Sequence, residues 1–377
     1  MRRIILCLSA LLIFTLPVSA DATEMPDGYG DFADSIPDDV AELLPDGFFS
    51  DDLSRITESL NTAISPGYII KVLGELLSGG LGDAFTLFVL LVGVVLLTSL
   101  LNTFTDAVSG GNLKGAVVYG SSVCAATAVV SLQLPRIVAA AEFFRRICIV
   151  MNSMIPVMTA LCLSGGNAAG AAVASASLGL QINLIEISAT VLVIPSVSAC
   201  MALTLADTLR VGEGSLSGIV GSIKHTLTFI FGLCSTLLMA SLSAQNILAA
   251  AGDNAGARTV KFVAGNMIPV VGSTVGETMR TLATSVRLLR STVGVAGIIA
   301  VAMLLLPFLI GLFLTRLALN SAASVGELLG CKNITKLYRE IASLYGYIIA
   351  AAAMASLLCV LSLTLFAIGS VAIGGLI

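Results

Sequence analysis

Uncharged apolar runs set the organisation of this 377-residue chain. After residue 83, no Asp, Glu, Lys or Arg occurs in residues 84–105, 115–135, 147–185, 187–206, 225–252, 291–315 and 341–377. A helix needs about 20 predominantly apolar residues to cross the hydrocarbon core of a bilayer. Six of these runs fit one spanning helix each, whereas 147–185 is ambiguous because 164–181 is rich in Ser, Gly and Ala. The pattern predicts an all-α, polytopic transmembrane helical bundle of six or seven spans.

The N-terminus has the order of a secretory signal peptide. Arg2 and Arg3 precede an apolar run over residues 4–16, and Val18-Ser19-Ala20 follows as a small-residue cleavage site. We expect residues 1–20 to be removed, so that residue 21 begins outside the cytoplasm. An uncleaved membrane anchor is the alternative.

Residues 21–83 predict an acidic extracytoplasmic head. This segment holds fourteen Asp and Glu residues against only Arg55 and Lys71. Its first part, residues 21–49, is rich in Asp, Pro and Gly, which favours an extended or weakly ordered chain.

Two amphipathic helices are predicted in the second part of the head. Asp52 and its polar neighbours offer an N-cap for the first helix. Pro66 suits the first position of the second helix, which we expect to end at Gly79-Gly80. Both helices are expected to lie on the membrane surface or to dock on a partner.

Composition supports lipid as the main solvent of residues 84–377. Hydrophobic residues make up 57% of the chain and charged residues 11%, against about 25% charged residues in soluble domains. Residues 84–377 carry nine acids and fifteen Lys and Arg. No basic cluster is interleaved with aromatic residues, so the sequence predicts no nucleic-acid partner.

A duplication is suggested by recurring landmarks. Met154-Ile155-Pro156-Val157 recurs as Met267-Ile268-Pro269-Val270, 113 residues later. Tyr119-Gly120 and Phe231-Gly232, like Pro195 and Pro307, are 112 residues apart. The repeat units would be 84–183, 184–297 and 298–377, although apolar segments also resemble one another by chance. The second copy lies in 257–282, which predicts either a re-entrant or interfacial hairpin or a kinked surface loop.

Small, polar and helix-breaking residues are the candidates for a passage through the bundle, since transporters with internal repeats place their pathway at the repeat interface. Close helix packing explains the small residues equally well, and Glu186 could also be an ordinary carboxylate at a helix end. The candidates for the pathway or for helix breaks are Asn152, Pro156, Gly165, Gly166, Asn167, Glu186, Pro195, Asn266 and Pro269.

Bond-making chemistry finds little support in the sequence. The chain has a single histidine, His225, and its eight cysteines show no paired metal-binding spacing. No phosphate-binding loop and no Ser–His arrangement occur. We therefore predict no catalytic residue, no metal, no cofactor and no enzymatic activity.

Several stretches resemble a known family. They are Ile36-Pro37-Asp38-Asp39-Val40, Ser164-Gly165-Gly166-Asn167, Leu192-Val193-Ile194-Pro195 and Ile268-Pro269-Val270-Val271-Gly272. Together with the signal, the acidic head and the apolar runs, they resemble the stage III sporulation protein AE family of endospore-forming bacteria over essentially the full length.

The resemblance implies a polytopic subunit of a sporulation channel or secretion-like complex that is required for spore development after engulfment. It implies the mother-cell-derived membrane around the forespore, with the head between the two membranes. Besides membrane lipid, the implied partners are the ATPase AA, the stage III proteins AB, AC, AD, AF, AG and AH, and stage II protein Q. A stand-alone secondary transporter and a scaffold for complex assembly are the alternatives.

Overall fold

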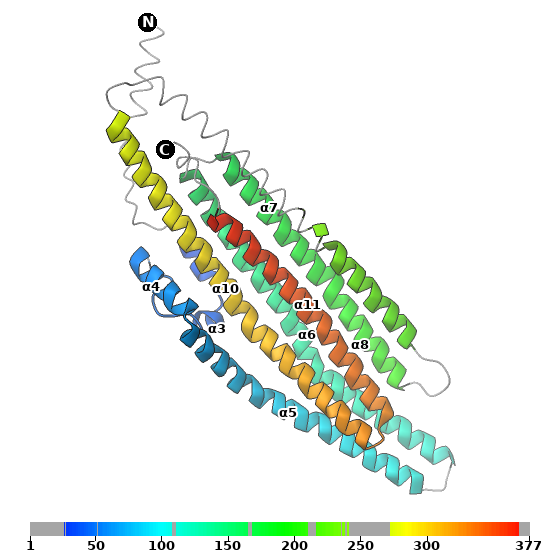
Figure 1. The fold of residues 1–377 in the computed structure, drawn as a ribbon. Coiled ribbons are helices and arrows are strands. Elements are labelled where there is room, and N and C mark those ends of the chain that lie inside the picture. The colour runs from blue at the N-terminus through cyan, green and yellow to red at the C-terminus, as the bar shows by residue number, and fades with distance from the viewer. Residues whose placement is uncertain are drawn as a thin grey trace.

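The computed structural model describes residue 26 and residues 28–50, 52–107, 111–164, 168–209, 216–234, 236–237, 240 and 272–368. In this part of the chain the regular structure is entirely helical, and no strand occurs. Long helices lie side by side along one axis, and short N-terminal helices pack at one edge of them (Figure 1).

The head is folded onto the bundle. It contains α2 (Tyr29–Asp34), α3 (Asp38–Ala41) and α4 (Leu53–Ile64). Phe32, Phe48 and Ile56 are fully buried, and α2, α3 and α4 contact α6 or α10. The expectation of a weakly ordered chain is therefore wrong for residues 28–49, because their few aromatic and aliphatic residues form a core against the bundle. Asp52 caps α4 as predicted, accepting from the Ser54 backbone N–H at 2.9 Å.

Helix α5 joins the head to the first span without a stop. It runs from Pro66 to Ala107, 42 residues, and passes through Gly79-Gly80. Pro66 is its first residue, as predicted, but the predicted end at Gly79-Gly80 is wrong. Gly80 allows close packing, since a Cβ there would come within 2.8 Å of the Leu314 side chain. Glycine costs about 1 kcal/mol in a helix interior, and α5 continues through both glycines.

Helix α6 combines two of the predicted spans. It runs from Gly111 to Ser164 and includes Pro135 and Pro156. The charged segment 136–146, which separates the charge-free runs 115–135 and 147–185, is therefore helical. The ambiguous run 147–185 is divided between α6 and α7 (Ala168–Ile187), and residues 165–167 lie outside the described residues.

A continuous helical segment runs from residue 168 to residue 209. It consists of α7, a π-helix η1 (Ser188–Val193) and α8 (Ile194–Leu209). Next come the helix Ser217–Cys234 and α10 (Gly272–Leu328). The last helix is α11 (Lys332–Ile368), which shares the largest helix–helix interface with α10. Gly330, with φ of 72°, ends α10 in the left-handed conformation typical of a helix C-cap.

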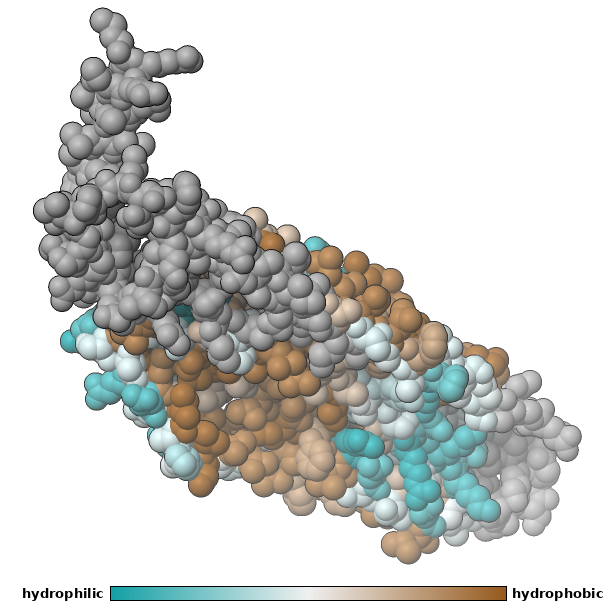
Figure 2. All heavy atoms as spheres, turned by 45° about the horizontal axis from the view of Figure 1, so that its top comes forward, coloured by the Kyte–Doolittle hydropathy of each residue, from teal (hydrophilic) through white to brown (hydrophobic). Residues whose placement is uncertain are grey.

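Six helices in the described part of the chain are long and apolar enough to cross a membrane. They are Pro66–Phe104, Ser122–Ser164, Ala171–Leu209, Ser217–Cys234, Leu288–Leu328 and Lys332–Thr364. A belt of hydrophobic residues covers the middle of the visible face, and hydrophilic residues gather nearer its ends (Figure 2). On α5, Phe85 and Phe104 are more than 60% exposed. These features confirm the all-α, polytopic helical bundle.

The charge-free runs of α10 and α5 lie at different levels along the bundle. The run of α10, 291–315, packs on the end of α11, where Gly294 lies against Leu363 and Ala367. The run of α5, 84–105, instead packs on the charged beginning of α11, because the Tyr338 hydroxyl donates to the Leu91 carbonyl at 3.0 Å. The helices are long enough for this arrangement: α10 has 57 residues and spans ~85 Å, whereas the hydrocarbon core is ~30 Å thick.

Two glycines of α10 give a direct test of this packing. A Cβ at Gly294 would lie 2.7 Å from the Ala367 Cβ and 3.3 Å from its Cα, whereas a Cβ at Gly311 meets nothing within 4 Å. We expect Gly294→Leu to destabilise the protein by about 1–3 kcal/mol through overpacking and Gly311→Leu to be tolerated. Thermal unfolding of the purified variants in detergent measures the difference. Equal melting temperatures would contradict the α10–α11 interface.

Candidate functional site

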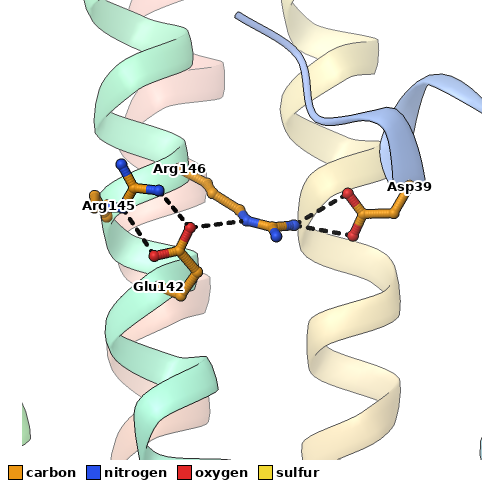
Figure 3. Close-up of polar contacts among 4 residues, drawn as sticks. All are labelled: Asp39, Glu142, Arg145 and Arg146. Carbon is orange, nitrogen blue, oxygen red and sulfur yellow. Dashed lines mark hydrogen bonds and ion pairs between the residues drawn. The ribbon is translucent and has the colours of Figure 1, made fainter.

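An ionic network ties the head to the middle of α6 (Figure 3). Arg146 donates to both carboxylate oxygens of Asp39, at 2.9 and 3.0 Å. Glu142, one turn earlier on α6, accepts from Arg145 at 2.6 and 2.8 Å and from Arg146 at 3.2 Å. The four side chains are partly exposed, so the network orients the head more than it stabilises it.

Two tight contacts extend this junction along α6. The hydroxyls of Ser35 and Ser153 are 2.8 Å apart. Gly28 has a φ of 89°, and a Cβ there would lie 3.5 Å from the Pro156 ring. Pro156 thus forms a contact surface for the head, and α6 continues past it to Ser164. The helix break expected at Pro156 is therefore absent.

The π-helix η1 interrupts the α-helical geometry between α7 and α8. Pro195 lies just after it and cannot donate a hydrogen bond to the Val191 carbonyl, which favours a widened turn here. The interruption predicted at Pro195 is thus a change of helix type rather than a break. π-Helical turns occur often at functional sites.

A small cavity lies beside η1. It measures about 10 Å³, room for about one water molecule. Ser188, Ala189 and Val193 line it from η1, opposite Ala351 and Ala355 of α11. Ser188 also donates to the Cys234 sulfur at 3.5 Å. Phe144 of α6 and Phe231 of the helix Ser217–Cys234 also line the cavity, so several helices meet at η1.

The candidate pathway residues do not form one site in the described part of the chain. Asn152 and Pro156 are exposed on α6, Pro156 lying beside the head, whereas Glu186 and Pro195 are exposed residues that flank η1. The remaining candidates, Gly165, Gly166, Asn167, Asn266 and Pro269, lie outside the described residues, as does the second Met-Ile-Pro-Val copy. The duplication and a passage at the repeat interface stay predictions.

Cross-helix polar pairs are the residues that sequence reasoning missed. Gln133 of α6 accepts from the Tyr345 hydroxyl, and Gln181 of α7 accepts from Ser362 at 2.8 Å. All four residues are buried. The only signal in the sequence is a glutamine inside a charge-free run, which gives no indication of its partner.

Two ion pairs connect the beginning of α11 to neighbouring helices. Lys224 pairs with Glu340 and also donates to Ser343 at 2.5 Å. Asp207 pairs with Lys336 at 2.7 Å and accepts from the Leu216 backbone N–H at 2.6 Å. Asp207 therefore connects α8 to both the following segment and α11.

Metal chemistry finds no site among the described residues, which contain no group of three or more His, Cys, Asp or Glu side chains placed to hold an ion. Six of the seven cysteines in this part are buried, and Cys124 is exposed. The described geometry offers helix packing, charge pairing and small cavities.

Together, the six apolar helices and the charge-paired bundle define a multi-pass helical membrane protein. The sequence model of the family described as stage III sporulation protein AE matches residues 51–370. The chain therefore belongs to the stage III sporulation protein AE family.

A curated relative is the stage III sporulation protein AE of Bacillus subtilis (strain 168). It is 28% identical over 213 residues, which cover 56% of this chain and 53% of that protein. The matched segment thus spans about half the length of the relative. No solved structure matches the chain.

Two variants test whether buried apolar contacts or the ion pair hold the head on the bundle. Phe32 is fully buried, so we expect Phe32→Ala to cost about 3–5 kcal/mol and to release the head. Asp39→Asn removes only a partly exposed ion pair, worth about 0.2–1 kcal/mol. Limited proteolysis of the head in the purified protein should be accelerated strongly by Phe32→Ala alone. Equal acceleration by both variants would show that the ionic network carries the docking.

Proposed function

We propose that this chain is a polytopic membrane subunit of a channel or secretion-like complex that links mother cell and forespore and is needed for spore development after engulfment. The observation that carries the proposal is the family match, which covers the part of the chain that forms the six apolar helices. The proposed location is the mother-cell-derived membrane around the forespore, with the head outside the cytoplasm. The proposed partners are the ATPase AA, the proteins AB, AC, AD, AF, AG and AH, and stage II protein Q.

The head supports a role in assembly. Its apolar side chains are buried against the bundle, whereas several of its acids point outward. Apart from Asp39, which pairs with Arg146, the exposed acids of this part of the head are Asp31, Asp34, Asp38, Glu42 and Asp46. A negative surface held rigidly on a membrane bundle suits a basic partner on the same side of the membrane.

A stand-alone secondary transporter is the second candidate. The observation in its favour is η1, since an irregular turn between Glu186 and Pro195 resembles the broken helices at which transporters bind substrates. The cavity of about 10 Å³ beside η1 is, however, far smaller than ligand sites, which measure about 300–1,000 Å³. This size favours a subunit whose passage forms together with partners.

Purification from sporulating cells and reconstitution distinguish the two functions. A complex subunit should co-purify with the other stage III A proteins, and the purified chain alone should give no solute flux in proteoliposomes. Solute flux from the chain alone, without co-purifying partners, would establish the transporter instead.

Glu186 tests whether the region of η1 takes part in passage. We expect Glu186→Gln to reduce the yield of mature spores while its level in the membrane stays normal, because the change removes a charge beside η1 without altering side-chain volume. Glu75→Gln, at an exposed position on α5, is the matched control and should leave the yield unchanged. Normal spore yield with Glu186→Gln would exclude this carboxylate from the passage.

A further inference from the structure

A polar cluster lies where α6, α10 and α11 meet. The α6–α10–α11 cluster consists of Gln133, Arg136, Thr315, Arg316 and Tyr345. Arg136 donates to the Thr315 hydroxyl, and Tyr345 donates to the Gln133 side-chain oxygen. Arg316 lies over the next residue of α11, Gly346, where a Cβ would be 3.5 Å from a guanidinium nitrogen. The three helices thus bring two guanidinium groups to one level of the bundle.

The positive charge of this cluster is not neutralised within the described structure. Arg145, Arg146 and Arg339 each pair with a carboxylate. In contrast, neither Arg136 nor Arg316 forms an ion pair with an acid in the described residues. Two cations without an acid at the edge of apolar helices are favourable sites for an anion.

A buried donor gives the second, independent indication of a ligand. Gln133 is fully buried, and its side-chain nitrogen has no hydrogen-bond partner. Gln133 and Arg136 are three residues apart on α6 and therefore lie on the same side of the helix. A buried amide donor is normally satisfied, so this nitrogen calls for an acceptor oxygen next to the arginines.

The position of the cluster identifies the membrane source of such an anion. The charge-free run 115–135 of α6 ends directly before Arg136, and the run 291–315 of α10 ends directly before Arg316. Both runs therefore end at the level of the cluster. Whichever of the two runs occupies the hydrocarbon core, the cluster lies at its border, where lipid phosphates are found.

We propose that the α6–α10–α11 cluster binds the phosphate group of an acidic membrane phospholipid. Guanidinium groups bind phosphate oxygens in pairs of parallel hydrogen bonds, and basic sites between transmembrane helices suit anionic headgroups. Arg316 is exposed and Arg136 half-buried, so a headgroup reaches the cluster from the bilayer. The buried side-chain nitrogen of Gln133 becomes a further donor where the phosphate enters between α6 and α11. The bound lipid would fasten α6 to the α10–α11 pair.

Native mass spectrometry of the full-length protein tests this site. The purified protein is delipidated in detergent and titrated with phosphatidylglycerol, phosphatidylcholine or inorganic phosphate. We expect phosphatidylglycerol to remain bound and phosphatidylcholine to bind more weakly. The pair Arg136→Gln and Arg316→Gln should weaken phosphatidylglycerol binding about a hundredfold, since a charge-assisted hydrogen bond worth about tenfold is lost at each arginine.

Two further variants complete the test: Arg316→Gln alone is a milder change, and Arg145→Gln is the control. Arg316 is exposed, so its single variant should fold even where the double variant does not, and should show part of the loss. Arg145→Gln removes a partly exposed arginine on the same helix that is already paired with Glu142, and should bind lipid as the unaltered protein does. Unchanged phosphatidylglycerol binding in the arginine variants would overturn the proposal. So would equal binding of inorganic phosphate, which would make the ligand a soluble anion.

Discussion

Hydrocarbon offers no hydrogen-bond partner to a peptide group, and the rest of this structure depends on that constraint. A chain with long charge-free runs can place them in lipid only as helices, which satisfy their own backbone. Helices α6 and α10 continue far beyond the thickness of one hydrocarbon core. Their charged residues must therefore lie at a border of the apolar region or be covered by other parts of the chain. The head meets the second need for Arg146 of α6, which pairs with Asp39, and Glu142 pairs with Arg145 and Arg146 on its own helix.

Polar side chains inside the bundle follow the same constraint by pairing across helices. Gln133 with Tyr345 and Lys224 with Glu340 join helices that are more than 100 residues apart in sequence. Each pair offsets the cost of withdrawing polar atoms from water and fixes which helices are neighbours. The polar pairs thus make the helix–helix contacts specific, which apolar packing alone would not do. A bundle held together by such pairs suits the proposed role as the membrane component of a larger complex.

Features that depend on local chemistry could be predicted from the sequence. Charge-free runs indicated the spanning helices, and Asp52 and Pro66 marked helix starts, because capping and proline geometry act within a few residues. The helix end predicted at Gly79-Gly80 was wrong, because α5 continues through both glycines and Gly80 packs closely on Leu314. The charged segment 136–146 is helical because its charges pair with one another one turn apart on α6, and Arg146 also pairs with Asp39 of the head. Of the candidate site, the irregularity at Pro195 could be anticipated, but the cross-helix partners could not, since nothing local encodes them.

Membrane extraction tests most directly whether this bundle resides in lipid. Membranes from cells that produce the full-length chain are washed at alkaline pH and then treated with detergent. We expect the chain to stay with the membrane through the wash and to enter solution only with detergent, because the exposed apolar faces of its helices require a hydrocarbon environment. Release of a folded, monomeric chain into detergent-free buffer would contradict this placement.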